Sequence, residues 1–264
     1  MSALRYHKKS LTTVIKEYIK FENKIYMEVK VLNKGIILLV IGFISFSSHA
    51  QYSNESEVSV VVTGGNTEVE VYNAKTTNEY KMGKNIFTLG GHYMYGTTSD
   101  EISSRNWDVN TRYERLFNET FGTFLGVIYE GDEFAGIDNR LNADLGGTYH
   151  YLKTEKMQGR VEAGARYRRE ESLLGNTLSE MQGRIYAMIG KKKTDNVEIK
   201  FWAEYLPNFT NSTDWQLNFA PSFQYNFMTN LALKWSYTGK YDNLPVPGNK
   251  KFDFQYTTSL IANF

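Results

Sequence analysis

The residue types that most often carry out catalysis or bind metals are scarce in this 264-residue sequence. Cysteine is absent, which excludes disulfides, thiolate metal sites and cysteine nucleophiles. Beyond residue 50 there are two histidines, His92 and His150, and the alternating pattern described below places them on distant strands. Neither a serine–histidine pair braced by a third polar group nor a histidine metal site is therefore expected. We predict no catalytic residue, no metal and no cofactor.

Acidic residues are the remaining candidates for chemistry. Asp132 and Glu133 are adjacent, and Asp138 follows in the same polar segment. Paired carboxylates of this kind can act on glycans or bind Ca²⁺. The same residues can also be explained without a ligand. In the barrel that is predicted below, they would form a solvated loop over the mouth, and Arg140 would contact acidic residues inside. Asp132, Glu133 and Asp138 are kept as candidates for an external ligand loop.

The first 50 residues differ in character from the rest. Lys30 and Lys34 precede an apolar run from Gly35 to Phe46, and small residues lie just before Gln51, as in a secretory signal peptide. A buried helix of a soluble domain is the alternative. We predict a signal peptide over residues 27–50, an upstream extension over residues 1–26 and a mature domain over residues 51–264.

Composition restricts the class of this mature domain. Aromatic residues make up 15% of the chain and only four prolines occur, which is atypical of a disordered segment. No apolar run reaches the roughly 18–20 residues of a membrane-spanning helix. Residues 1–50 hold eight of the 30 basic and three of the 29 acidic residues. Residues 51–264 thus carry 22 basic against 26 acidic residues, which does not support a nucleic-acid-binding surface.

From Gln51 onward apolar and polar residues alternate with a period of two, the pattern of a strand with one apolar and one polar face. The segment from Phe252 to Phe264 is the clearest case. Twelve such stretches are predicted, near residues 57–64, 67–81, 86–96, 104–116, 120–131, 137–152, 157–171, 179–191, 197–206, 214–227, 231–241 and 252–264. In the second, Asn73 and Lys75 interrupt the expected apolar face. In the tenth, Pro221 cannot donate to a ladder, and a local bulge would accommodate it.

The polar faces carry long charged side chains of both signs. A soluble sandwich would turn these to water, whereas a membrane barrel turns them into its lumen and its apolar face to lipid. A sheet in lipid cannot leave an edge unpaired, so we predict a closed, transmembrane antiparallel β-barrel of about twelve strands. Cross-strand pairs such as Arg140 with Glu162 would neutralise each other. The predicted lumen-lining residues are Arg140, Asp144, Arg160, Glu162, Arg166, Arg184 and Glu204.

Two further patterns favour a bilayer. Aromatic residues gather at the strand ends, for example Trp107 and Tyr237 at one end and Tyr113 and Phe227 at the other, as at the two interfaces of a barrel. The connections alternate between tight turns and longer polar loops, which is typical of periplasmic turns and external loops. The tight Gly64–Asn66 connection is the exception.

Four segments resemble a known family in their order and spacing. They are Thr63–Thr67, Gly131–Arg140, Glu162–Glu170, and Tyr241–Pro245 followed by Lys251–Asp253. The sequence from Ser56 to Phe264 resembles the domain-of-unknown-function 481 family of Gram-negative bacteria, whose members are labelled salt-induced outer-membrane proteins. Gly65, where the family more often has serine, and Pro247 are departures. The resemblance implies an outer-membrane barrel and no particular substrate, cofactor or catalytic residue.

Together these observations predict a non-enzymatic barrel in the outer membrane of a Gram-negative bacterium. Its expected role is a narrow channel for small polar solutes or a structural component of the envelope, because twelve strands enclose more space than filled eight-stranded barrels and less than open porins. A lipid-modifying or hydrolytic barrel enzyme is the alternative, and a soluble periplasmic β-protein is a third class. The expected partners are outer-membrane lipids and, through the strand ending at Phe264, the barrel assembly machinery, with no nucleic acid.

Overall fold

The structure is a computed structural model that describes residues 51–63, 69–99, 101–245 and 250–264. The predicted signal peptide and upstream extension, the Gly64–Asn66 turn and Pro247 lie outside these ranges. Among the residues within them, no helix is long and apolar enough to cross a membrane.

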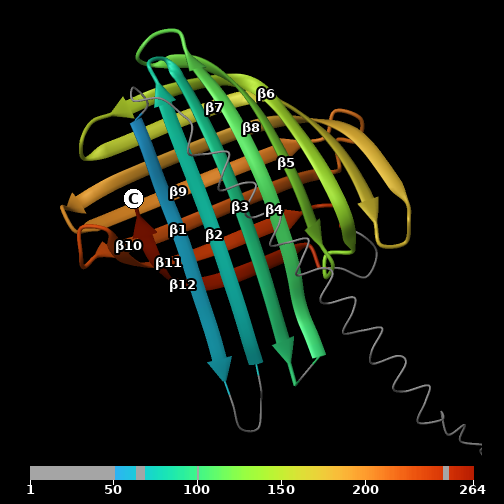
Figure 1. Ribbon diagram of the computed structural model, residues 1–264. Coiled ribbons are helices and arrows are strands. Elements are labelled where there is room, and N and C mark those ends of the chain that lie inside the picture. Colours follow the sequence, from blue (N-terminus) through green and yellow to red (C-terminus); the bar gives the residue numbers. More distant parts are fainter. Residues whose placement is uncertain (1–50, 64–68, 100, 246–249) are drawn as a thin grey trace, which may run out of the picture. The chain divides into compact units, whose positions relative to one another are not determined.

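Twelve antiparallel strands form one closed barrel, in which each strand pairs with its neighbours in sequence and β1 pairs with β12 (Figure 1). The strands are β1 (Gln51–Thr63), β2 (Val69–Met82), β3 (Asn85–Thr98), β4 (Glu101–Leu116), β5 (Phe121–Asp132), β6 (Ile137–Lys153), β7 (Met157–Ser172), β8 (Thr177–Thr194), β9 (Val197–Pro207), β10 (Trp215–Asn226), β11 (Leu231–Asp242) and β12 (Phe252–Asn263). Every predicted stretch corresponds to a strand, although β1 begins earlier than expected, at Gln51. The prediction of a closed all-β barrel is confirmed.

The period-two alternation sorts side chains between an outer wall and the lumen. On the outer wall, Phe254 is 61% exposed and Leu145 is 61% exposed, whereas Glu162 inside the barrel is 2% exposed. Aromatic rings of neighbouring strands meet on the outer wall, as Trp107 and Tyr129 do with centroids 5.2 Å apart. Because the apolar residues face outward and the ionic residues inward, the barrel has the polarity of a transmembrane barrel rather than of a soluble one.

In strand β2, the face that points outward is the opposite of the one expected from the sequence. Lys75 lies directly opposite the buried Glu57 of β1, and paired residues share a face of the sheet, so Lys75 and Asn73 face the lumen. Tyr72, on the other face, is 44% exposed. Asn73 and Lys75 therefore do not interrupt an apolar face. Val69 and Val71 lie on the inward side with these polar residues, so apolar residues occur on both faces of β2.

Pro221 is accommodated without the expected bulge. On one side of it Phe219 pairs with Gly239, and on the other Ser222 pairs with Ser236, which is the same register. No extra residue is therefore inserted into β10. Ala220 and Pro221 make no pair with β11, while Pro221 remains in register opposite Phe201 of β9. Because Pro221 has no backbone N–H group, the pairing between β10 and β11 is interrupted at this point.

The seam that closes the barrel is short and depends on a buried carboxylate. β1 and β12 pair at four positions, Glu55–Val58 against Leu260–Asn263, whereas β1 and β2 pair along the whole of β1. Inside this seam the Glu57 carboxylate accepts a hydrogen bond from Ser259 Oγ at 2.6 Å and one from Lys234 Nζ at 2.9 Å. Glu57 thus links β1 to both β12 and β11 where backbone pairing is limited.

A second buried cluster lies inside the barrel around Phe124 of β5. Its side chain is 1% exposed, and the guanidinium carbon of Arg112 lies 4.1 Å from its ring centroid. The ring fits because Gly146 and Gly164 face each other on β6 and β7, and a Cβ on Gly146 would lie 2.9 Å from Phe124 Cζ. Gly146 therefore provides space for an aromatic ring in the lumen, and Gly164 allows β7 to lie close to β6 beside it.

We expect Glu57→Gln to destabilise the barrel by about 2–3 kcal/mol, because it leaves the partly buried Lys234 ammonium without its nearest counter-charge. The measurement is urea-induced unfolding of the protein folded in lipid vesicles. Glu55→Gln is the matched control, since Glu55 lies 3.8 Å from Lys234 Nζ and its side chain is 37% exposed. We expect Glu55→Gln to lower the free energy of unfolding by less than about 1 kcal/mol. Equal shifts for the two variants would show that Glu57 does not secure the seam.

We expect Gly164→Ala to destabilise the barrel by about 1–3 kcal/mol, because the added Cβ would overlap the Leu145 carbonyl oxygen and lie 2.8 Å from Gly146 Cα. The same unfolding experiment measures it. Gly147→Ala is the control, since a Cβ there would meet nothing closer than the Gly122 carbonyl oxygen at 3.8 Å. A neutral Gly164→Ala variant would contradict the proposed close packing.

Candidate functional site

The candidate site is the charged lumen wall formed by β4 to β9. Arg140 and Asp144 lie on β6, Arg160, Glu162 and Arg166 on β7, Arg184 on β8 and Glu204 on β9. Each is followed directly by an outward-facing residue, as Arg184 is by the 55% exposed Ile185, because side chains alternate along a strand. The structure places all of these sequence-predicted residues on the lumen face.

Glu162 lies at the centre of this wall, with its side chain fully buried. It accepts hydrogen bonds from Arg184 Nη1 at 2.6 Å and from Arg112 Nη2 at 2.9 Å, and Arg160 Nε lies 3.1 Å from its Oε1. Arg112 comes from β4 and Glu162 from β7, so this contact spans β5 and β6. One carboxylate thus joins side chains from three different strands and fills this side of the lumen.

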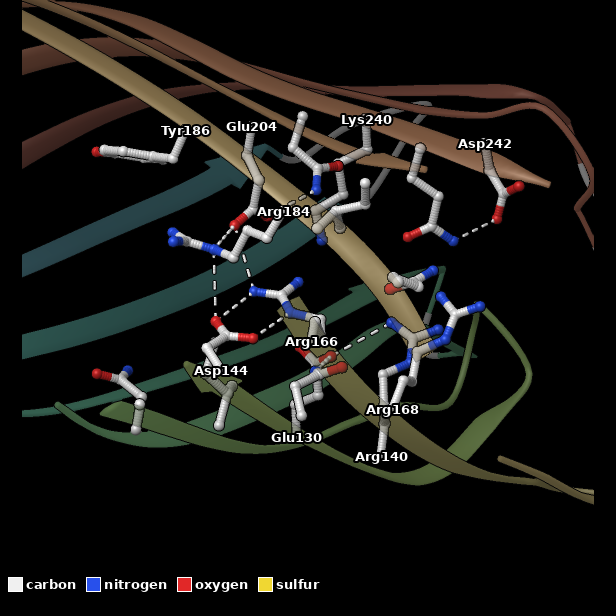
Figure 2. A pocket seen from close by; sticks show the side chains of 18 of the residues that line it. Glu130, Arg140, Asp144, Arg166, Arg168, Arg184, Tyr186, Glu204, Lys240 and Asp242 are labelled. Atoms are coloured by element: carbon white, nitrogen blue, oxygen red, sulfur yellow. Dashed lines mark hydrogen bonds and ion pairs between the residues drawn. The ribbon is translucent and has the colours of Figure 1, made fainter. Parts of the chain in front are cut away.

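Two further carboxylates extend the cluster toward β9 (Figure 2). Asp144 accepts a bidentate pair of hydrogen bonds from Arg166, at 2.7 and 2.8 Å. Glu204 accepts from Arg184 Nε at 2.7 Å and from Arg166 Nη2 at 3.2 Å. Glu114 completes the group, since Arg112 donates to it at 2.8 Å. We call this group the central ion cluster: Arg112, Glu114, Asp144, Arg160, Glu162, Arg166, Arg184 and Glu204.

The central ion cluster is balanced, with four guanidinium groups and four carboxylates. Buried charges are costly unless they are paired and hydrogen-bonded. The shared contacts of Arg184 and Arg166 meet this requirement, because each guanidinium contacts more than one carboxylate. The cluster can therefore stay ionised inside the barrel.

Arg140 does not form the expected pair with Glu162. It contacts Glu130 on β5 at 3.2 Å and Glu170 on β7 at 2.7 Å. The register explains the difference: Glu130 and Glu170 lie directly opposite Arg140, whereas Glu162 lies opposite Thr148. Arg140 therefore belongs to a separate group of charges nearer the β5–β6 turn.

The segment containing the candidate external acids is a tight turn rather than a loop over the mouth. Asp132 ends β5 and Asp138 belongs to β6, which leaves Glu133–Gly136 as the turn. Asp132 Oδ1 accepts from the Ala135 amide at 3.0 Å, and Glu133 pairs with Arg105 at 3.1 Å. Asp132 thus has its partner within the turn and Glu133 has one on β4, and Asp138 accepts from its neighbour Asn139 at 2.9 Å.

The two histidines lie apart and each has its own acidic partner. His92 Nδ1 is 3.4 Å from Asp108, and His150 Nε2 is 2.8 Å from Glu114. Among the described residues, no group of three or more histidine, aspartate or glutamate side chains is arranged to hold a metal ion.

A cavity of about 480 Å³ adjoins the central ion cluster and extends toward the end of the barrel that carries the β5–β6 turn. Arg166, Arg184 and Glu204 line it on the inside, and Asp132 and Ala135 line it near the β5–β6 turn. Its lining also includes lumen residues that the sequence analysis did not single out: Phe124, Asn142, Arg168, Gln182, Tyr186 and Trp202.

These lumen residues divide into two kinds. Arg168 and Gln182 share the inward alternation of Arg166 and Arg184, so extending that alternation by one more position would have identified them. The aromatic residues were harder to find, because aromatic side chains in such strands are expected to face lipid. For Trp202 the signal is its spacing of two residues from the inward Glu204.

The fold is similar to barrels of known structure. An outer membrane channel from Pseudomonas putida F1 matches with a TM-score of 0.51 and 12% identity, over 83% of this chain and 97% of that chain. The NanC porin matches with a TM-score of 0.47 and 9% identity, over 81% and 98% of the two chains. The KdgM porin matches with a TM-score of 0.46 and 12% identity, over 81% and 99%. The similarity to the Pseudomonas channel shows a shared barrel fold.

No curated protein matches the sequence. A family model described as "Protein of unknown function, DUF481" matches residues 56–264, in agreement with the resemblance found in the sequence. The chain therefore belongs to the DUF481 family.

Proposed function

We propose that this protein lies in the outer membrane of a Gram-negative bacterium and is a non-enzymatic, narrow channel for small polar solutes. The observation that carries the proposal is the interior of the barrel. It contains an ionic cluster next to a cavity of about 480 Å³ that extends toward the β5–β6 turn, instead of a packed apolar core. A lumen of this polarity is suited to the passage of polar molecules.

The central ion cluster narrows the lumen on one side. The Arg112–Glu162 contact runs from β4 to β7 and covers the lumen faces of the two strands between them. On the wall formed by β10, β11 and β12, short hydroxyl side chains lie opposite one another: Ser222 pairs with Ser236, and Ser236 with Thr257. Short side chains fill less of the lumen, so the passage is expected along this wall.

An enzymatic role has less support from the geometry. A lipid-modifying or hydrolytic barrel needs a base positioned beside a nucleophile. Among the described residues, both histidines contact lumenal carboxylates, His92 with Asp108 and His150 with Glu114. A structural role in the envelope remains the competing class, and it predicts a barrel that passes no solute.

We expect the purified protein to make liposomes permeable to glycine and to give small conductance steps in planar bilayers. Arg112→Ala should increase both the swelling rate and the conductance, because it removes the side chain that spans β5 and β6. Folding of each variant is checked by circular dichroism and by heat-dependent migration in electrophoresis.

Arg105→Ala is the matched control for this experiment. Arg105 is an arginine on the same strand, but it faces outward, pairs with Glu133 in the β5–β6 turn and has a side chain that is 42% exposed. Its permeability should equal that of the original protein. If neither the original protein nor Arg112→Ala exceeds protein-free liposomes and bilayers, the channel proposal fails and a structural role is favoured.

A further inference from the structure

Five lysines gather at one end of three adjacent strands, the end opposite the β5–β6 turn. Lys153 ends β6, Lys156 lies in the β6–β7 turn, and Lys191, Lys192 and Lys193 lie near the end of β8. All five are exposed, and within the part of the chain that the structure describes none of their ammonium groups has an ion-pair or hydrogen-bond partner. We call these five residues the lysine patch.

The backbone brings the members of the lysine patch together. Lys191 lies directly opposite Met157, the first residue of β7, and the Lys192 amide donates to the Lys156 carbonyl oxygen at 2.8 Å. Lys153 lies at the end of β6, which pairs with the same part of β7. Adjacent strands are about 4.8 Å apart, so the patch is about 10 Å wide across the three strands. Ammonium groups this close repel one another unless anions lie nearby.

The acidic residues of this region do not balance the lysine patch. Residues 153–156 and 191–200 contain six lysines and three acids, and one of these acids, Glu198, pairs with Lys200 at 3.2 Å. The other two are Glu155 and Asp195, one in each turn. At the opposite end of the same strands the sign is reversed, since residues 132–140 and 168–180 contain six acids and three arginines. The excess of positive charge is therefore a property of this end.

The lysine patch borders the outer wall of the barrel. Lys191 follows Ile189 by two residues on β8, so both side chains face outward and lie about 7 Å apart along the strand. Ile189 is 39% exposed, and beside it the 40% exposed Tyr151 donates a hydrogen bond to the Met188 carbonyl oxygen at 3.2 Å. Tyrosine near a strand end marks the level at which hydrocarbon gives way to headgroups. The ammonium of Lys191 therefore lies at the headgroup level.

We propose that the lysine patch binds the headgroups of anionic phospholipids, whose acyl chains lie against the outer wall of β6 to β8. A cluster of about four to eight basic residues beside a membrane-spanning segment attracts anionic headgroups. A phospholipid with a net negative charge matches both parts of the surface, because its phosphate meets the ammonium groups and its chains meet Ile189 and Tyr151. The binding requires a barrel that lies in a membrane, but it does not require that the barrel conducts.

The test measures which lipids surround the lysine patch in a bilayer. Because the chain contains no cysteine, Ile189→Cys can carry a single bimane label at this place. The full-length protein is reconstituted in phosphatidylcholine that contains either brominated phosphatidylglycerol or brominated phosphatidylcholine, and quenching of the label reports the local amount of each. We expect phosphatidylglycerol to be enriched about threefold at the label. The enrichment should disappear in about 0.5 M NaCl, because salt screens exposed charges.

A second label position provides the matched control. Leu233 also faces outward at the same end of the barrel, on β11, and the β10–β11 turn beside it contains no charged residue. A label on Leu233→Cys should show equal quenching by the two brominated lipids. Equal quenching at position 189 as well would overturn the inference, because the lysines would then be solvated without selecting a lipid.

Paired substitutions test the lysines themselves. In the Ile189→Cys protein, Lys156→Gln/Lys191→Gln should lower the enrichment of phosphatidylglycerol from about threefold to below about 1.5-fold. Lys81→Gln/Lys84→Gln removes the same charge at the same end and should leave the enrichment unchanged. In these two control residues the ammonium groups already have partners, since Lys81 pairs with Glu79 and Lys84 donates to the Phe117 carbonyl oxygen, each at 2.9 Å.

Equal losses of enrichment in the two double variants would overturn the inference, because the total charge of the protein would then explain the preference. Enrichment that persists at high salt would also contradict it. The result is independent of the proposed channel. Lys156→Gln/Lys191→Gln should leave the permeability of liposomes to glycine unchanged, and a barrel that passes no glycine can still enrich anionic lipid.

Discussion

The constraint on which the rest of this molecule depends is that a sheet in lipid must pair all of its backbone polar groups. Eleven of the twelve pairings between strands join neighbours in sequence, and the β1–β12 pairing closes the ring. This last pairing is short, at four positions, so side chains assist it. Glu57, Ser259 and Lys234 make their contacts inside the lumen. Closure of this barrel therefore depends partly on its polar interior.

Closure also turns the charged face of every strand inward, where each charge needs a partner. The central ion cluster meets this need with equal numbers of guanidinium and carboxylate groups that share contacts, as Arg184 does with Glu162, Glu204 and Asp144. Removing one member leaves another buried charge uncompensated, which costs several kcal/mol. The central ion cluster is thus held in one shape by many coupled contacts. In the proposed channel, a neutral cluster of fixed shape would select solutes by size more than by charge.

The sequence predicted the closed barrel and its strands, because a period of two assigns a face of the sheet to each residue. It could not predict which charges meet, because that depends on strand register. Arg140 contacts Glu130 and Glu170 instead of Glu162 for this reason. The Arg112–Glu162 contact could not be predicted from the sequence either, because it spans two intervening strands. The pattern of apolar residues misled in two places. Asn73 and Lys75 were assigned to the apolar face of β2 but face the lumen, and Phe124 lies in the lumen although aromatic residues were assigned to lipid.

The lumen contains two polar regions that differ in whether their polar groups have ionic or hydrogen-bond partners. In the central ion cluster every charged group has an ionic partner, whereas the adjoining cavity leaves the amide oxygens of Asn142 and Gln182 without donors. The same cavity is lined by Lys240 of β11 and Asp253 of β12, which lie opposite each other, so its wall carries charges of both signs. In the proposed channel, a solute entering from the external end would meet these charges before it reaches the balanced central ion cluster. Neither region would then strongly favour one sign of charge, because buried or enclosed charges of opposite sign offset each other.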